Sequence, residues 1–383
     1  MFFRFSCIRD KFSTFFLFHI DFCSFFFSFA HFFAKYRPKI VFCMPKKRNF
    51  GHSNEITGMM RRLYLLLSCV TCCALLYAQE SRSVYNFLSI SSSSHAVALG
   101  GRNISSIEDD LSLAFQNPAL LGSVNDKSLN LNFMTYMKGS KLGSAGFSKV
   151  VGERGTWGVG AQFAGYGSIK ETLASGEIVG DSQALDMVLD GMYSYSLDDH
   201  WVGGVTGKFL YSKYAGYSSC ALAVDLGVNY YDWDRDFSFS AVAANLGGQV
   251  KAFGDEHERL PFDLAIGFTK GIAHAPVKIT VTMNDLTRWN KDYFYTEEEE
   301  PGFGRILMNH LNLGVELLPT DRMYVALGYN FRRASEMKAA GSSHAAGLTC
   351  GAGISLKRFK LGLAYAKYHV SAPSFSFSLG YSL

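Results

Sequence analysis

The side chains of this chain that could do chemistry are scattered, and their spacing matches no familiar catalytic arrangement. Asp109 and Asp110 are paired carboxylates of the kind used in acid–base catalysis, but no histidine of suitable spacing accompanies them. No histidine after residue 58 lies in the HExxH spacing of a zinc protease or the GxSxG context of a serine hydrolase. His257 precedes Glu258 but lacks the second histidine of a zinc-binding helix. We therefore predict no catalytic residue, no metal site and no cofactor, and a protein that is not an enzyme.

The cysteines are concentrated near the N-terminus. Six of the eight precede residue 74, and only Cys220 and Cys350 follow. Two thiols supply neither a zinc site nor a disulfide framework. By strand parity we expect both to face lipid, where a cysteine behaves as a small apolar side chain.

An acidic run with aromatic neighbours stands out in the second half of the chain. The four consecutive glutamates lack the alternating oxygen ligands of a calcium loop, so a solvated loop is the simpler interpretation. Aromatic side chains beside charges are typical of a protein contact or of an interfacial girdle. We predict that this loop is a partner surface. Its residues are Trp289, Tyr293, Phe294, Tyr295, Glu297, Glu298, Glu299 and Glu300.

The first 79 residues differ in composition from the rest. They hold 11 Lys and Arg against 3 Asp and Glu, whereas residues 80–383 hold 26 against 30. The later part is therefore acidic, which argues against a nucleic-acid partner because phosphate binding needs a basic surface. Residues 1–50 contain 16 of the 33 phenylalanines, a density that no folded core would pack.

Residues 1–58 admit three interpretations: a membrane helix, a real appendage, or translated upstream sequence. A helix over residues 14–34 would place Asp21 in mid-span, at a cost of about 2.5–3.5 kcal/mol. Arg61 and Arg62, the apolar stretch 63–76 and the small residue Ala78 together form a complete signal peptide. We predict upstream sequence over 1–58, a true start at Met59 or Met60, a signal peptide over 59–78, and export.

From residue 128 the sequence alternates between large apolar and small or polar residues, the period of a β-strand. The second face carries Gly, Ala, Ser and Asn, which suits a crowded barrel lumen better than the wet face of a sandwich. Strands of about 9–11 residues span a bilayer when tilted, and only a closed barrel satisfies their hydrogen bonds there. We predict an all-β transmembrane antiparallel β-barrel of about 14 strands over 128–383. The predicted strands lie near 128–136, 143–150, 156–166, 184–197, 201–213, 217–231, 236–247, 261–271, 276–286, 305–318, 322–333, 345–357, 358–368 and 372–383.

The links and the C-terminus support an outer-membrane barrel. All long links, 167–183, 248–260, 287–304 and 334–344, follow odd-numbered strands, as expected for short periplasmic turns and longer external loops. The chain ends in an alternating strand, the form of an outer-membrane assembly signal, although leucine replaces the usual final aromatic residue. The apolar positions of this predicted signal are Phe375, Phe377, Leu379, Tyr381 and Leu383.

The segment 79–127 is not strand-like, and its motifs resemble a known family. The doublet Gly100-Gly101, the pair Asp109-Asp110 and the run Asn117-Pro118-Ala119 resemble the N-terminal hatch of FadL-like barrels, which include PorV and PorQ of the Bacteroidetes type IX secretion system. Residues 260–264 (LPFDL), 282–289 (TMNDLTRW) and 363–370 (LAYAKYHV) resemble the PorQ-like members. The resemblance covers 84–383 and implies a structural role for the hatch residues.

This resemblance implies a non-enzymatic component of type IX protein secretion in a Gram-negative, Bacteroidetes-type outer membrane. The implied task is to anchor or dock partners of the cell-surface attachment complex. The implied partners are a PorZ-like surface protein, a PorU-like sortase and a PorV-like barrel, besides outer-membrane lipid. A second function stays open: a FadL-like channel for hydrophobic small molecules, with the hatch as its gate.

Overall fold

The computed structural model describes residues 84–136, 139–172, 175, 177–254, 257–290, 302–339, 346–369 and 372–383. The predicted upstream sequence and signal peptide lie outside the described residues. Within the described residues, no helix is long and apolar enough to cross a membrane.

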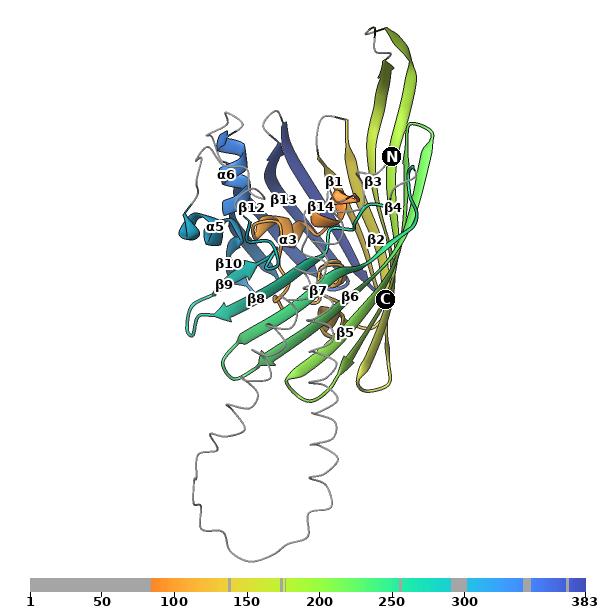
Figure 1. Ribbon diagram of the computed structural model, residues 1–383. Helices are drawn as coiled ribbons and strands as arrows, with labels where there is room; N and C mark the ends of the chain where they lie inside the picture. The colour runs from red at the N-terminus through yellow and green to blue at the C-terminus, as the bar shows by residue number, and fades with distance from the viewer. Residues whose placement is uncertain are drawn as a thin grey trace, which may run out of the picture. The chain divides into compact units, whose positions relative to one another are not determined.

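Fourteen antiparallel strands close into a barrel in which each strand pairs with its neighbours in sequence and β1 pairs with β14 (Figure 1). The prediction of an all-β, 14-stranded barrel is therefore confirmed. The strands are β1 (Ser128–Thr135), β2 (Lys141–Val151), β3 (Gly155–Thr172), β4 (Ile178–Ser196), β5 (Trp201–Tyr214), β6 (Tyr217–Asp232), β7 (Phe237–Lys251), β8 (Asp263–Gly271), β9 (Val277–Met283), β10 (Leu311–Thr320), β11 (Met323–Asn330), β12 (Leu348–Leu356), β13 (Phe359–His369) and β14 (Ala372–Ser382).

The two faces of the wall differ as the alternation predicts. In β6, Leu222 and Val224 are exposed on the outer face, whereas Ala223 and Asp225 are buried in the lumen. Large apolar side chains are exposed on the outside of strands all around the barrel. Such a continuous apolar belt would not be stable in water, and a closed sheet leaves no unpaired edge in lipid. The chain is therefore a membrane barrel of the outer-membrane type.

The last strand closes the barrel. Phe377 of β14 lies opposite Phe133 of β1, and Leu379 lies opposite Leu131. The apolar positions of the predicted assembly signal share the outer face with Leu131, and Phe375, Phe377, Leu379 and Leu383 are exposed there. Recognition of this strand by assembly machinery stays a prediction.

Two predicted strands are partly wrong. The helix α5 (Phe303–Asn309) overlaps the start of the strand predicted over 305–318. The strand predicted over 322–333 ends at Asn330, where α6 (Phe331–Ala339) begins. Ile306 and Asn309 of α5 are buried three residues apart, the spacing of one helical face. A short apolar run fits a strand or a helix equally well by period, so the sequence alone misassigned it.

The links sort by length as predicted, with one correction. The links after even-numbered strands are all brief, and this edge of the barrel is named the short-turn end. The opposite edge, the long-loop end, carries the links 252–262, 284–310 and 331–347, the last two with α5 and α6 (Figure 1). The predicted long link 167–183 is mostly strand, because β3 extends to Thr172 and β4 begins at Ile178.

Residues 84–127, named the hatch, lie inside the barrel (Figure 1). Val97, Leu99 and Leu121 are all buried, and short helices replace strands along the whole segment. The helices of this segment pack mainly against the strands of the lumen wall. Its elements are η1 (Asn86–Ser89), α3 (Ser94–Ala98), α4 (Leu111–Ala114) and η2 (Pro118–Ser123).

Strand parity makes a prediction for the two cysteines of the barrel, Cys220 in β6 and Cys350 in β12, which are partly exposed on the outer face. A membrane-impermeant maleimide should leave both unmodified in intact membranes and should label both after denaturation. Arginine at Val224, on the same face, should cost about 2–4 kcal/mol near the midplane. Rapid labelling of either thiol in the folded barrel would show that the register is wrong there.

Candidate functional site

The glycine doublet of the hatch is held against the wall by wall side chains. Gly100 and Gly101 have φ values of 102° and 99°, a left-handed backbone that side chains rarely adopt. The Gly100 N–H donates to the Thr349 hydroxyl at 3.0 Å, and the Asn330 amide donates to the Gly100 carbonyl at 3.1 Å. The doublet thus lets the hatch backbone turn while it remains hydrogen-bonded to β11 and β12.

The run Asn117-Pro118-Ala119 begins η2 and closes the hatch upon itself. The Asn117 carboxamide accepts a hydrogen bond from the Ala119 N–H at 3.0 Å and donates one to the Ile104 carbonyl at 2.8 Å. Asn117 and Ala119 are buried, and Pro118 occupies the first turn, where a missing N–H costs nothing. These contacts hold two parts of the hatch together, and the role that the resemblance implies for this run stays a prediction.

The acidic residues of the hatch point toward the short-turn end. Asp110 accepts a hydrogen bond from the Ser112 N–H at 2.9 Å and so caps α4. Asp109 pairs with Lys360 of β13, and Glu108 pairs with Lys278 of β9 at 2.8 Å. These carboxylates line a chamber of about 290 Å³, named the inner chamber. Each of these carboxylates has a hydrogen-bonding or charged partner, and the absence of a catalytic role for Asp109 and Asp110 stays a prediction.

A buried ion pair that the sequence analysis missed joins the hatch to the wall beside the inner chamber. His95 Nε2 of α3 lies 3.4 Å from Glu316 Oε1 of β10, and both side chains are almost fully buried. The His95 ring also stacks on Tyr324, with centroids 4.3 Å apart. Burial alone would lower the pKa of His95, but the Glu316 carboxylate outweighs it and raises the pKa to about 9. The imidazolium is therefore the stable form at neutral pH.

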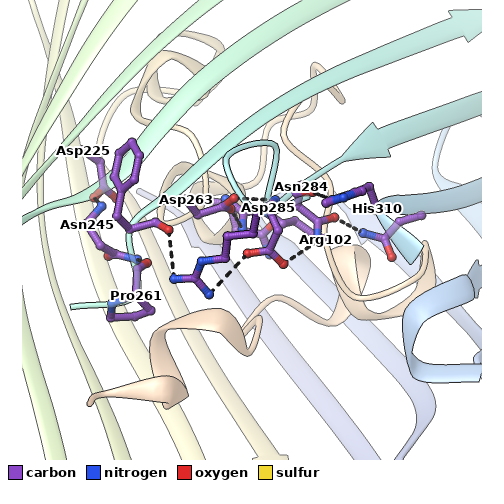
Figure 2. A network of polar contacts seen from close by, with 12 residues as sticks. Arg102, Asp225, Asn245, Pro261, Asp263, Asn284, Asp285 and His310 are labelled. Carbon is purple, nitrogen blue, oxygen red and sulfur yellow. Dashed lines mark hydrogen bonds and ion pairs between the residues drawn. The ribbon is translucent and has the colours of Figure 1, made fainter. Parts of the chain in front are cut away.

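On the other side of the hatch, a chamber of about 610 Å³ opens toward the long-loop end and is named the vestibule. Its floor carries a network of ion pairs and hydrogen bonds (Figure 2). Arg102 of the hatch pairs with Asp263 of β8, and Asp263 also accepts a hydrogen bond from the Asp285 N–H at 2.6 Å. Arg332 of α6 pairs with Asp285 at 2.9 Å and with Glu336 at 2.7 Å. The hatch, the barrel wall and α6 are thus connected through charged side chains.

A second buried pair lies in the wall of the vestibule. Lys208 Nζ of β5 is 2.6 Å from Asp225 Oδ2 of β6 and also donates to Oδ1 of the Asn245 side-chain amide at 3.1 Å. Asn245 interrupts the register of β7, with a φ of 59°, and its N–H donates to Asp225 at 2.7 Å. This irregularity lets one asparagine side chain satisfy the buried lysine and also reach the Pro261 carbonyl (Figure 2).

Three of the later stretches singled out in the sequence, 260–264, 282–289 and 363–370, contribute residues to the vestibule. Asp263 belongs to the first, Asp285 and Arg288 to the second, and Tyr368 to the third, and all of them line the chamber. Gly101 and Arg102 of the hatch line it as well. A signal for such residues is present in the sequence, since a charge at a lumen position of a strand needs a partner.

The predicted partner loop is only partly described. Trp289 packs between Phe303 of α5, stacked at 5.9 Å, and His310, at 4.3 Å between ring centroids. Its indole N–H donates to the Leu286 carbonyl at 2.6 Å, and 39% of the residue is exposed. The other seven residues of the predicted loop, Tyr293, Phe294, Tyr295, Glu297, Glu298, Glu299 and Glu300, lie outside the described residues.

Among the described residues, no group of three or more His, Cys, Asp or Glu side chains could hold a metal ion.

Comparison with known proteins identifies the fold and no closer relationship. No family model matches the sequence, and no curated protein matches it. The structure is similar to the CymD monoaromatic hydrocarbon channel, with a TM-score of 0.50 and 11% identity over 78% of this chain and 99% of that chain. It also matches the toluene transporter TodX of Pseudomonas putida (TM-score 0.47, 11% identity, 74% of this chain and 95% of that one). A FadL homologue of Pseudomonas aeruginosa matches with a TM-score of 0.45 and 11% identity, over 76% of this chain and 98% of that chain. At these identities the likeness extends to the fold alone.

Proposed function

We propose that this protein is a hatch-gated outer-membrane channel of the FadL type, which admits small molecules with a hydrophobic body. The observation that carries the proposal is that the hatch separates two chambers inside one closed barrel, the vestibule on one side and the inner chamber on the other. The fold shared with a hydrocarbon channel supports it. With the usual orientation of such barrels, the vestibule opens to the cell exterior and the inner chamber to the periplasm.

The lining of the vestibule suits a molecule that is apolar over most of its surface and polar at one end. Phe87, Leu88 and Tyr136 line it together with the charged network on its floor. Its volume lies within the range of sites for small organic ligands. In the closed state, passage to the inner chamber requires the hatch to move, because α3 and its flanking residues fill the lumen.

Permeation through proteoliposomes tests the proposal. Barrels with hatch residues 91–106 replaced by a Gly-Ser linker should admit a hydrophobic fluorescent probe faster than the full chain, since the obstruction is gone. The full chain should in turn exceed protein-free vesicles. The heat-modifiable gel shift of a folded barrel serves as the control for folding. If the probe enters vesicles that contain either folded protein no faster than it enters protein-free vesicles, the channel proposal is wrong.

A second candidate is a docking component of type IX secretion, and a different observation favours it. The stretches that resemble PorQ-like proteins are far apart in sequence and yet gather around the vestibule. A shared partner surface at the long-loop end would account for this convergence. On this proposal, the barrel anchors a PorZ-like surface protein, near a PorU-like sortase and a PorV-like barrel.

Affinity purification of the tagged barrel from outer membrane tests the docking role. The full chain should recover sortase-like or surface proteins, and deletion of residues 290–302 should release them while the barrel stays inserted and heat-modifiable. Unchanged recovery after the deletion would remove this loop as the docking site, and a barrel recovered without any partner would remove the role itself.

A further inference from the structure

Two polar side chains from different elements meet over the glycine doublet at the floor of the vestibule. Arg333 of α6 places its guanidinium carbon 3.9 Å from the centroid of the Tyr368 ring of β13. A Cβ atom on Gly101 would lie 2.6 Å from Arg333 Nη2 and 3.4 Å from the Tyr368 hydroxyl. Both groups therefore surround one position of the hatch where only a glycine leaves room.

Both groups have unused hydrogen-bonding capacity. Arg333 Nη1 and the Tyr368 hydroxyl are buried and have no hydrogen-bond partner in the part of the chain that the structure describes. A buried donor without an acceptor loses the hydration it had in water and gains nothing in return. Two such donors side by side call for an acceptor that the described chain does not provide.

The charges around them show which acceptor would fit. The other cations of the vestibule floor are matched by carboxylates, as in the pairs of Arg102 with Asp263 and of Lys208 with Asp225. Within the described residues Arg333 forms no ion pair, because Glu336 and Asp285 both pair with Arg332. The Arg333 guanidinium is therefore a positive charge without a matching carboxylate among the described residues, which favours an anion over a neutral group as its acceptor.

The surroundings of the two donors are aromatic. The Tyr136 ring lies 5.6 Å from the Tyr368 ring, and both residues line the vestibule with Phe87. A flat fork of guanidinium N–H groups matches the two oxygens of a carboxylate or phosphate. An aromatic or aliphatic body attached to that oxyanion would contact the tyrosine rings.

We propose that Arg333 and Tyr368 form a binding site for a small organic anion, with both side chains donating to one carboxylate or phosphate group. Because the site includes Gly101 of the hatch and Arg333 of α6, the bound anion links the hatch to the long-loop end. Binding at this site does not require passage through the barrel, so a negative result for binding would leave the channel proposal untouched, and a negative permeation result would leave the binding proposal untouched.

Binding of benzoate, benzamide and inorganic phosphate to the full purified barrel tests this site. Benzoate should bind at least about tenfold more tightly than benzamide, its neutral analogue of the same shape, because charge-assisted hydrogen bonds are stronger. Inorganic phosphate competing with benzoate would show that the oxyanion alone suffices. Failure of phosphate to compete, with benzoate still bound, would show that the site takes a carboxylate with an organic body. Equal affinity for benzoate and benzamide would overturn the proposal.

Variants locate the site. Arg333→Gln should weaken benzoate binding about tenfold to a hundredfold, and Tyr368→Phe, which removes only the hydroxyl, about twofold to tenfold. Arg322→Gln, an exposed arginine at the short-turn end, is the matched control and should bind as the wild type does. If Arg333→Gln does not fold, Tyr368→Phe decides the question. Unchanged affinity in a folded Arg333→Gln or Tyr368→Phe barrel would overturn the assignment.

Discussion

Replacing His95 with alanine is expected to lower the free energy of unfolding of the barrel by about 3–5 kcal/mol, because it leaves the Glu316 carboxylate buried without its partner. The double variant His95→Ala with Glu316→Gln should recover part of this loss, since no buried charge remains. His257→Ala, which removes an exposed histidine from the link between β7 and β8, is the matched control and should change stability by less than about 0.5 kcal/mol. Urea unfolding in lipid vesicles measures all three.

The same pair predicts a pH dependence with a definite sign. The pKa of His95 is raised to about 9 from its ordinary value of 6.5, so the folded state holds its proton more tightly than the unfolded state. This contribution is fully present below pH 6.5 and is lost as the pH rises through about 9, amounting to about 3 kcal/mol. The full chain should therefore lose stability between pH 6 and pH 10. Equal losses in the full chain and in the double variant would show that the pair does not titrate as expected.

Replacing Gly204 with alanine is expected to force the hatch away from the wall. Gly204 of β5 faces the lumen, and a Cβ atom there would lie 2.3 Å from the Pro118 carbonyl carbon and 2.4 Å from the Ala119 nitrogen. These are backbone atoms, which cannot rotate aside as a side chain can. Overpacking of this kind costs about 1–3 kcal/mol, and a direct backbone clash belongs at the upper end.

Limited trypsin digestion of the detergent-solubilised barrel measures the displacement. Cleavage after Arg102, whose side chain is held by Asp263 in the intact hatch, should become at least about tenfold faster in Gly204→Ala, because a loss of 1.4 kcal/mol raises the open population tenfold. Gly207→Ala is the matched control on the same strand, since a Cβ there meets nothing within 4 Å. Similar cleavage rates in the two variants would mean that the hatch does not press on Gly204.

The wall of the barrel was predictable because its signal is local. The alternation along β6 arises because one face of the strand contacts lipid and the other faces the lumen, and it does not depend on which strand is the neighbour. The sequence therefore predicts both the strand and the side chains that point outward. The segment that became α5 shows the limit of this rule. Its apolar residues are too few for the period to distinguish helix from strand, and contacts at the long-loop end decided the outcome.

The hatch motif was visible in the sequence as a set of unusual residues, but its contacts were not. Gly100 and Asn117 stand out by type, since a left-handed turn favours glycine and a helix start favours asparagine. That Gly100 would be hydrogen-bonded to Thr349 follows only after the barrel closes around it.

The sequence by itself determined the class of the protein, a membrane barrel with a non-strand segment before it, because period, face composition and link length depend on neighbours along the chain. Only the tertiary structure decided the chambers and their chemistry. His95 meets Glu316, and Arg333 meets Tyr368, because closure of the barrel brings strands together around a hatch that no local pattern can place. A charged residue at a lumen position predicts that a partner is present, but the identity of that partner depends on how the hatch lies inside the barrel.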